Sequence, residues 1–463
     1  MTKNRRLWLA IALATVLSPT RAWAHAHLKR SEPAAGSAVT SSPQWIRLWF
    51  SEQPELSMTV VSMKDANGNE FALGPPQNDP RNPLAVSARV SQPLPPGRYT
   101  VAWRTAGSDG HPSHGTFSFI VLTKATLPGN GSAQVGTVAD AIDSGNTPAA
   151  SSTGSDNGAE ANAASSLSNS LARTFTFVGL LALIGTIVFR TLILSRARGI
   201  SLELRARMES RAAALGLAAS ALVIITALAR LFLEARMMNA IPDMRTMSMT
   251  DMAMHTRWGF ALRLELGAAL LALVSFALAV RQLRGAWLVA TIAAIILAAT
   301  PALAGHAAAS PKFTSLMIAT DFLHVLGGAS WLGSLFAIMV IGVHLSLTLD
   351  GVERWSSIAS LVNSFSPTAL AAAAVVVTSG LIASWVHLET FSALWQTAYG
   401  QMLLVKVLLV VITLTIGAYN FRRVQPQLVT EVGPTRLRRS AALELSVGFL
   451  ILLVTGFLTG ISP

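Results

Sequence analysis

The chain has 463 residues, of which 52% are hydrophobic, and a formal net charge of +12 at pH 7. It contains no cysteine, which excludes a disulfide framework and metal sites built on thiolates. Many of its arginines fall in short segments between long apolar runs. The positive charge is therefore an orientation signal for a membrane protein and does not indicate binding to nucleic acid.

Residues 1–24 have the layout of a secretory signal peptide. Three basic residues precede an apolar run from Leu7 to Leu17, and the segment ends with the A-x-A pattern Ala22-Trp23-Ala24. Cleavage after Ala24 makes His25 the first residue of the mature chain. A free α-amine beside an N-terminal imidazole can bind one metal ion through two nitrogens, so His25 is a candidate ligand.

Residues 25–122 are predicted to form a small, exported all-β domain. Short runs rich in β-forming residues alternate with Pro, Gly and Asn, as is typical of strands joined by turns. Many short strands with frequent turn signals indicate a β-sandwich. The predicted strands cover residues 45–50, 58–63, 86–90, 99–104 and 116–121.

The segment before the last predicted strand carries candidate metal ligands. Asp109 and His111 lie in a turn-like run rich in Gly and Pro. Imidazole and carboxylate suit a divalent transition metal, and nitrogen-rich planar sets favour Cu(II). His27, which shares a strand face with His25, and His114 compete for the same role. An ordinary surface turn with solvent-exposed histidines is the alternative interpretation.

This domain resembles the CopC copper-binding family. The motifs that carry the resemblance are His25-Ala26-His27-Leu28, Ser31-Glu32-Pro33-Ala34, Phe50-Ser51-Glu52, Leu94-Pro95-Pro96-Gly97-Arg98-Tyr99 and Ser108-Asp109-Gly110-His111. The resemblance implies a Greek-key sandwich and a Cu(II) site formed by the amine and imidazole of His25 with Asp109 and His111. Some members also bind Cu(I) in a Met-rich loop, but this domain has only Met58 and Met63, so we expect no second site in it.

Residues 123–168 are predicted to be a flexible linker. Gly, Ser, Ala, Asn and Thr dominate the segment, and it has almost no aromatic residues with which to build a core. A flexible chain of this length spans roughly 35–40 Å on average. The β-domain could therefore reach much of the nearby membrane surface.

Residues 169–463 are predicted to form an all-α polytopic membrane domain with eight transmembrane helices. Each apolar stretch is about long enough to cross a bilayer. The expected spans are 171–194, 211–233, 258–280, 286–304, 316–345, 366–386, 401–421 and 440–461. Arginines concentrate in alternate connections, which the positive-inside rule assigns to the cytoplasm. This predicts a multi-pass protein of the bacterial inner membrane with both termini outside and the β-domain in the periplasm.

The connection between the second and third spans is rich in methionine. Half of the chain's 14 methionines lie between Met237 and Met254. Thioether sulfur favours Cu(I), so this segment is a candidate Cu(I) site. Its proposed ligands are Met247, Met249, Met252, Met254 and His255. The alternative is an interfacial loop whose methionines dip into lipid.

Three further residues form a candidate copper path in the membrane. His306 ends the fourth span, and Asp321 and His324 lie three residues apart in the fifth, where they share a helix face. Ionisable groups inside a span are costly and indicate function. A carboxylate can orient a ligating imidazole. The alternative is a hydrogen-bonded Asp–His pair that only holds helices together.

The membrane half resembles the CopD copper-resistance domain, most strongly from Gly305 to Phe421. The motifs include Gly305-His306-Ala307, the segment from Asp321 to Leu332, Phe365-Ser366-Pro367, Asn420-Phe421-Arg422 and the helix of Glu444. The resemblance implies copper uptake across the inner membrane. Both halves in one chain resemble CopC–CopD fusion proteins.

These observations predict a copper importer that is not an enzyme and that serves copper homeostasis and resistance. Its expected partners are copper ions, the lipid bilayer and a periplasmic copper chaperone or reductant. No P-loop or phosphorylatable DKTG signature is present, which argues against an ATP-driven pump. Two alternatives stay open. One is a haem- or copper-containing membrane oxidoreductase that uses His306, His324 and His387. The other is a non-transporting periplasmic copper buffer.

Overall fold

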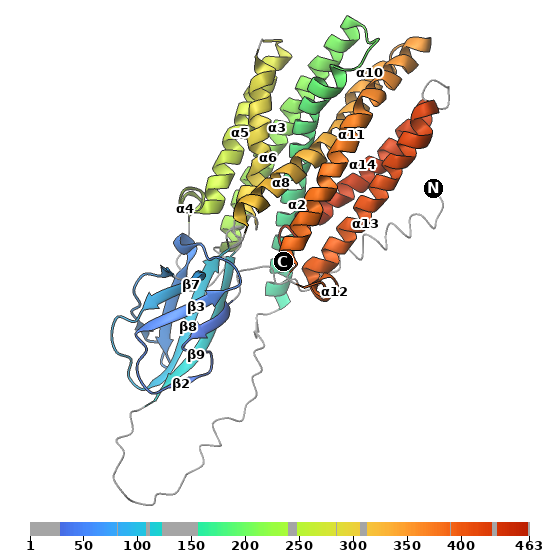
Figure 1. Ribbon diagram of the computed structural model, residues 1–463. Coiled ribbons are helices and arrows are strands. Elements are labelled where there is room, and N and C mark those ends of the chain that lie inside the picture. The colour runs from blue at the N-terminus through green and yellow to red at the C-terminus, as the bar shows by residue number, and fades with distance from the viewer. Residues whose placement is uncertain are drawn as a thin grey trace, which may run out of the picture.

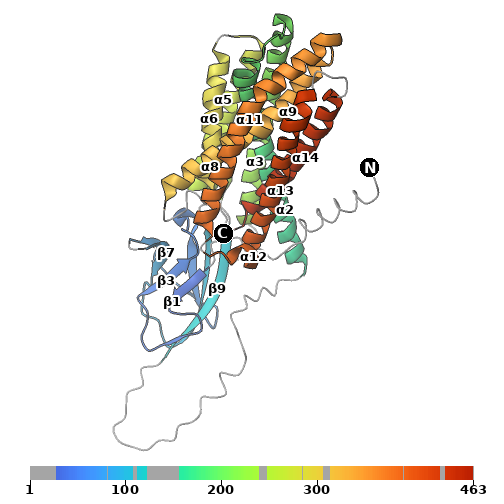
Figure 2. The same ribbon diagram turned by 45° about the vertical axis from the view of Figure 1, so that its right-hand side comes forward.

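The computed structural model describes residues 28–80, 82–107, 112–122, 156–238, 248–283, 285–305, 313–388, 390–427 and 433–461. Within them, a β-sheet domain lies at one end of a long helical bundle (Figures 1 and 2). The predicted signal peptide lies outside the described residues, as does most of the predicted linker.

The N-terminal domain is built from two sheets. The first has the order β1 (Leu28–Glu32), β3 (Trp45–Phe50), β7 (Asn82–Arg89) and β6 (Gln77–Asp79). The second has the order β2 (Ala38–Val39), β9 (Pro112–Val121), β8 (Gly97–Ala106), β4 (Val60–Asp65) and β5 (Glu70–Phe71). All pairs are antiparallel except β2 with β9, which is parallel.

Alternating side chains of these strands form the core of the sandwich. Ile46, Leu48 and Phe50 of β3 are buried, whereas Arg47 between them is exposed, as expected for a strand with one face inward. The rings of Phe50 and Trp103 meet edge to face at 5.1 Å, which joins the two sheets. The predicted all-β sandwich is confirmed. The predicted strand 58–63 begins later, at Val60, because Leu56–Met58 forms a 3-10 turn, η1.

Four strand termini meet at one end of the sandwich, which we call the docking end and define by Leu28, Phe50, Ala106 and Pro112. Leu28 at the start of β1 pairs with Phe50 at the end of β3. Ala106 at the end of β8 pairs with Pro112 at the start of β9. The chain that leaves Phe50 returns to Ala106, whose carbonyl accepts a hydrogen bond of 2.8 Å from the backbone N–H of Glu55.

The remaining described chain is helical. The α-helices are α2 (Asp156–Val188), α3 (Leu202–Met238), α4 (Met249–His255), α5 (Arg257–Val280), α6 (Ala286–Ala304), α8 (Thr314–Gly328), α9 (Ser334–Ala337), α10 (His344–Ser346), α11 (Gly351–His387), α12 (Ala393–Gln396), α13 (Ala398–Tyr419) and α14 (Gly433–Leu458). Four π-helical segments adjoin them: η3 (Phe189–Leu194), η4 (Ala329–Gly333), η5 (Ile338–Val343) and η6 (Asn420–Val424). The 3-10 helix η7 covers Gln425–Gln427.

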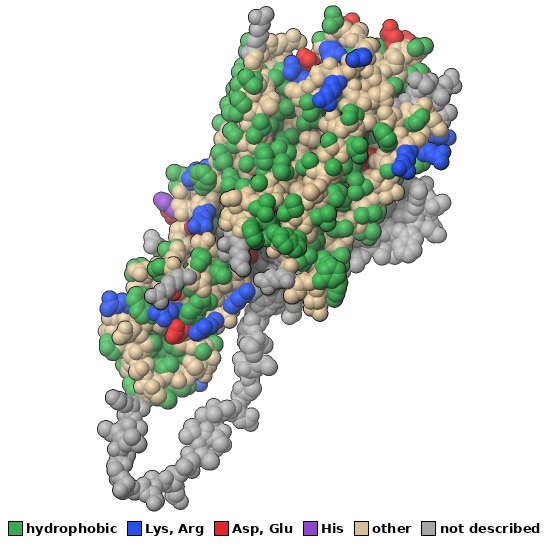
Figure 3. Space-filling view, viewed as in Figure 1, with side chains coloured by type: hydrophobic (Ala, Val, Ile, Leu, Met, Phe, Trp, Pro, Cys, Tyr) green, Lys and Arg blue, Asp and Glu red, His purple; other side chains and the backbone are tan. Residues whose placement is uncertain are grey.

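Eight of these segments are long and apolar enough to cross a membrane, which confirms the predicted number of spans. Hydrophobic side chains dominate the middle of the bundle, and charged ones gather towards its ends (Figure 3). Several boundaries differ from prediction, for example those of α3 and α14, which begin at Leu202 and Gly433 instead of 211 and 440. Helix α2 begins at Asp156, inside the predicted linker, and α11 begins at Gly351 because polar residues such as Glu353 continue the helix.

The first span packs against α3, α14 and η4 and permits unusually close helix contact. Gly185 of this span faces Gly333 of η4 so closely that a Cβ atom on Gly185 would lie 2.1 Å from the carbonyl carbon of Gly333. Pairs of small residues allow such backbone approach in membranes. The fifth span, predicted as one helix, is interrupted by η4 and η5. This contact therefore fixes η4 against α2.

Candidate functional site

The docking end of the β-sandwich packs against the helices at the near end of the bundle (Figure 1). Met58 and Ala106 are fully buried in one apolar cluster with Met252 of α4 and Trp258 of α5. Ala227 and Ala235 of α3 and Leu262 of α5 complete the cluster. Seven buried side chains from both domains therefore share one small core.

Polar contacts border this cluster. The backbone N–H of Arg257 donates to Oε2 of Glu55 at 3.2 Å, and Nη1 of Arg257 donates to Oε1 of Gln53 at 3.2 Å. Sequence reasoning missed Gln53, Glu55 and Arg257. No periodicity or motif could have revealed them, because the contact joins residues about 200 positions apart.

The predicted Cu(II) ligands His25, Asp109 and His111 lie outside the described residues, as does the competing His27. Their described neighbours in the chain are informative. Leu28 begins β1, and the segment with Asp109 and His111 connects Ala106 to Pro112. All three of these flanking residues belong to the docking end. The sandwich thus gives both predicted ligand segments their points of attachment at one end.

His114 is described and lies opposite Arg104 in the β8–β9 ladder. Its side chain reaches solvent, but neighbouring protein atoms partly desolvate the imidazole and lower its pKa below the usual 6.5, and the charge of Arg104 lowers it further. The imidazole of His114 is therefore neutral near pH 7. Neutrality alone does not make His114 a ligand, and the choice between His111 and His114 stays a prediction.

The Met-rich segment forms a short helix, α4, for which Ser248 is the N-cap: its Oγ accepts from the backbone N–H of Asp251 at 3.0 Å. The predicted ligands on this helix differ in their exposure to solvent. Met252 is 1% exposed and packs in the shared core, whereas Met249 and Met254 are 48% and 55% exposed. The last predicted ligand, Met247, lies outside the described residues.

His255 ends α4 and is also exposed. Its Nδ1 lies 3.7 Å from Oδ1 of Asp251, one turn earlier. Of the predicted ligands that the structure describes, the exposed side chains Met249, Met254 and His255 can therefore meet copper from solvent without displacing the β-domain.

In the membrane domain, His324 of α8 has a partner on another helix. Its Nδ1 lies 3.0 Å from Oγ of Ser379 in α11. The Ser379 hydroxyl donates its proton to the carbonyl of Val375 at 2.6 Å, so it must accept from Nδ1 of His324. The proton of the neutral imidazole is then on Nδ1, and Nε2 carries the lone pair that can bind a metal ion.

Asp321, the second predicted residue of the path, interacts electrostatically with Tyr399 and Lys406 of α13. The described hydrogen bond of His324 is to Ser379, and the expectation that Asp321 also orients this imidazole stays a prediction. The third predicted residue, His306, lies outside the described chain. The cluster around His324 therefore joins α8, α11 and α13.

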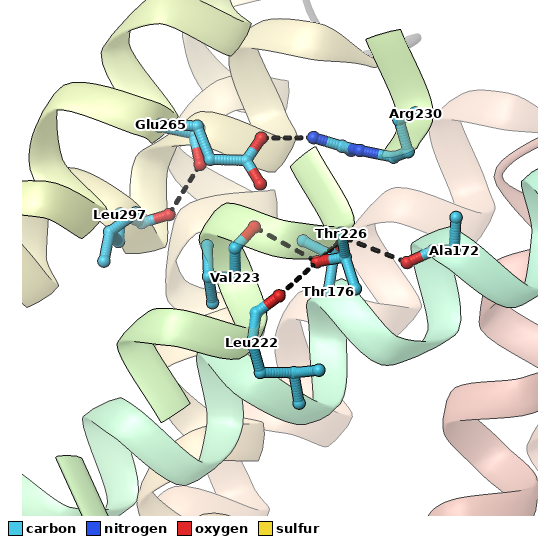
Figure 4. Close-up of polar contacts among 9 residues, drawn as sticks. Ala172, Thr176, Leu222, Val223, Thr226, Arg230, Glu265 and Leu297 are labelled. Carbon is cyan, nitrogen blue, oxygen red and sulfur yellow. Dashed lines mark hydrogen bonds and ion pairs between the residues drawn. The ribbon is translucent and has the colours of Figure 1, made fainter. Parts of the chain in front are cut away.

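Ion pairs lie buried near the β-domain end of the bundle. Arg230 of α3 hydrogen-bonds Glu265 of α5 (Figure 4). Glu234 of α3 accepts from Asn169 at 2.7 Å and pairs with Arg173 of α2 at 3.6 Å. Sequence reasoning assigned these residues no role, although charged residues in apolar helices were the signal that could have found them.

Another buried carboxylate lies near the middle of α14. Oε1 of Glu444 accepts from Nε1 of Trp331 at 3.0 Å, and Oε2 accepts from Nδ2 of Asn420 at 2.9 Å. Among the residues that the structure describes, no three His, Cys, Asp or Glu side chains gather as a metal site. A copper site in the described part therefore needs methionine or residues from the other segments.

Comparison with known proteins agrees with this division of the chain. Three family models match it: the CopC domain over residues 28–122, the N-terminal domain of copper resistance protein D-like proteins over 164–313, and copper resistance protein D over 359–458. The copper transport protein CutJ of Bacillus subtilis is 26% identical and aligns with 99% of this chain and 78% of its own.

Two shorter proteins match the β-domain. Copper resistance protein C of Escherichia coli is 36% identical over 22% of this chain and 83% of its own length. The crystal structure of CopC from Methylosinus trichosporium OB3b is 27% identical, covers 22% of this chain and 100% of that chain, and gives a TM-score of 0.21.

Proposed function

The chain belongs to the CopC–CopD copper-resistance family, and on that premise we propose that it captures Cu(II) in the periplasm and carries copper into the cytoplasm. The β-domain is the capture module, with His25, Asp109 and His111 as ligands. The multi-pass membrane domain is the conduit. This makes the protein a transporter of the bacterial inner membrane and not an enzyme.

One observation supports this proposal above the others. The docking end of the sandwich, from which the ligand segments leave, packs directly on α3, α4 and α5. Met58 and Ala106 share a buried core with Met252 of the Met-rich helix. A copper ion released at the docking end is therefore next to thioether ligands and to the outer ends of the spans.

The change of ligand type implies a change of oxidation state. Imidazole, amine and carboxylate suit Cu(II), whereas thioether sulfur suits Cu(I). Each copper ion that passes from the β-domain to Met249 and Met254 must therefore gain one electron. A periplasmic reductant outside this chain supplies it.

Inside the membrane, we assign the next step to His324. Ser379 holds its imidazole so that Nε2 is free to bind copper, and the position in α8 is a few turns from the near end of the bundle. His306, at the end of the neighbouring span, is the proposed second ligand. Asp321 and Lys406 set the charge around this site.

Uptake of radioactive copper into proteoliposomes tests this function. The full-length protein should import copper faster under reducing than under oxidising conditions, and His324→Ala should stop import. No uptake by the intact protein would favour a periplasmic copper buffer. A Soret band in the visible spectrum of the purified protein would instead indicate a haem oxidoreductase.

A further inference from the structure

Glu444 is buried inside the membrane domain, with neutral groups around its carboxylate. The residue is 3% exposed. Its two oxygens accept hydrogen bonds from Trp331 at 3.0 Å and Asn420 at 2.9 Å. An indole N–H and an amide N–H carry no net charge. They therefore satisfy the hydrogen-bonding capacity of the carboxylate but do not neutralise it.

The other two buried glutamates of the described chain are held differently. Glu265 binds Arg230, and Glu234 binds Arg173. Paired charges are the usual arrangement for acidic side chains in a span. Glu444 has only neutral hydrogen-bond donors as described partners. It therefore does not form a structural ion pair of the kind that Glu234 and Glu265 form.

Charged side chains on the segments around Glu444 have other partners or face outward. Segments α2, α9, α13, η4, η6 and η7 pack close to or against α14. These segments have four charged residues with described side chains. Arg173 pairs with Glu234, and Lys406 interacts with Asp321. Arg422 and Arg423 are exposed. The arginines of α14 itself, Arg436, Arg438 and Arg439, lie one to two turns before Glu444, and Arg436 donates to Gln427.

Both donors to Glu444 come from π-helical segments. Trp331 lies in η4, and Asn420 is the first residue of η6. Such segments are rare and occur frequently at functional sites. A return of either segment to α-helical geometry would rotate its donor away from the carboxylate. Trp331 also lies about two turns beyond His324 on the same span, so one span contributes to both sites.

The hydrogen-bond chemistry allows one added proton at a defined atom. The indole of Trp331 can only donate, so Oε1 must remain an acceptor. Asn420 can donate through Nδ2 or, after its amide rotates by half a turn, accept through Oδ1. Oδ1 of Asn420 is buried without a hydrogen-bond partner in the described state. A proton on Oε2 of Glu444 would give that oxygen a donor.

We propose that Glu444 is a proton-binding site that exchanges its proton for copper during transport. This inference rests on the proposed function. In the proton-bound state, Oε2 of Glu444 carries the proton and donates a hydrogen bond to Oδ1 of Asn420. When Cu(I) enters the bundle, the Oε2–H bond breaks, the proton leaves to water on the periplasmic side, and the carboxylate accepts from Nδ2. After the copper ion leaves to the cytoplasm, Oε2 takes up one proton from water on the cytoplasmic side. One positive charge replaces another, so the net charge inside the membrane is unchanged.

Proteoliposomes that contain the full-length protein and a pH-sensitive dye test the exchange. Cu(I) is added outside with a reductant, and radioactive copper and internal pH are followed together. We expect the interior to become alkaline as copper enters. Glu444→Gln, which has the same shape but cannot release a proton, should lose the pH signal. Glu353→Gln, at an exposed glutamate of α11, is the matched control and should keep it.

An infrared spectrum of the same samples reports on the proton itself. A carbonyl band from a protonated carboxyl group should be present in the intact protein and in Glu353→Gln, and absent in Glu444→Gln. A band that survives in Glu444→Gln overturns the proposal, as does copper uptake with an unchanged pH signal in that variant. If no protein imports copper, the proposed function fails, and the infrared band still decides whether Glu444 binds a proton.

A folding control completes the design. If Glu444→Gln does not give a monodisperse protein, Asn420→Leu replaces it, because this change keeps the carboxyl group and removes the amide that accepts its proton. Loss of the pH signal in Asn420→Leu supports the exchange, and a signal equal to that of the intact protein overturns it.

Discussion

The backbone N–H of Arg257, the first residue of α5, donates a hydrogen bond of 3.2 Å to the side chain of Glu55 in the β-domain. This contact ties a loop of the exported domain to the start of a membrane span. Because this hydrogen bond lies beside the shared apolar core, its presence reports that the two domains are docked.

We expect Arg257→Glu to weaken docking and slow copper uptake without changing Cu(II) binding by the β-domain. The change places like charges beside Glu55, and an exposed contact of this kind is worth about 1 kcal/mol. Hydrogen exchange at the amides around Ala106 measures docking. Arg281→Glu, at an exposed residue at the other end of α5, is the control. Equal exchange in both variants would show that Arg257 does not hold the domains together.

Cleavage of the signal peptide should create the Cu(II) site. With His25 first, its α-amine and imidazole bind one ion together. A protein that keeps Ala24, or has an added Met, should bind Cu(II) far more weakly because the amine is displaced. Competition titration with a chelator of known affinity measures the difference. Indistinguishable affinities would refute the amine as a ligand.

Replacement of His111 by Ala should remove one nitrogen ligand and change the EPR spectrum of bound Cu(II), whereas His114→Ala should leave it unchanged. Ligand histidines must be neutral, so Cu(II) affinity should fall as the pH drops through about 6.5. If the two variants exchange behaviour, His114 is the ligand, which its position three residues after His111 would permit.

His114 also makes a separate contribution to folding. Because its pKa is lowered in the folded domain, the unfolded chain binds the proton more readily. The stabilisation is fully present above the unfolded pKa of 6.5 and is lost as the pH falls below it. Measurement of the free energy of unfolding against pH should show less acid destabilisation in His114→Gln than in the natural protein. Identical pH profiles would contradict the direction of this pKa shift.

The methionines of α4 should separate into two kinds. Met249→Leu with Met254→Leu removes two exposed thioethers and should slow uptake at low copper. Met252→Leu conserves volume in the buried core and should cost less than about 1.5 kcal/mol of stability. Uptake assays over a range of copper concentrations distinguish the variants. Unchanged uptake in the double variant would favour methionines that merely contact lipid.

Ser379→Ala should reduce copper uptake by roughly 10–100-fold, the usual effect of losing a group that orients a metal ligand. The change frees the His324 imidazole to adopt either tautomer, and His324→Ala should abolish uptake. Asp321→Asn should have a smaller effect than either. Thr378→Ala, at the exposed neighbour of Ser379, is the control. Normal transport by His324→Ala would exclude this histidine from the path.

Elements that have a regular pattern of hydrophobic residues were predictable from the sequence. Contacts between distant segments were not. The sandwich followed from runs such as Trp45–Phe50, and the eight spans followed from apolar length. The strands β1, β2, β5 and β6 were missed because each is very short or mostly polar. The π-helical segments follow from packing and leave no pattern in composition.

In the candidate sites, too, single residues were predictable from the sequence and their partners were not. His324 was identifiable because an ionisable residue stands out in an apolar helix. Its partner Ser379 was not, because the hydrogen bond crosses 55 positions of sequence and serines are common in spans. Glu444 was visible as part of a resemblance, but its significance depends on which groups surround it, and only the packed bundle shows that.

The buried ion pairs of α3 have a consequence for biogenesis. Arg230 needs Glu265 of α5, which is synthesised later, and Glu234 needs Arg173 of α2, which is synthesised earlier. Until α5 emerges from the ribosome, α3 carries an arginine whose partner does not yet exist. Release of α3 alone into lipid would expose that charge. We therefore expect α2, α3 and α5 to leave the translocon as one assembled unit.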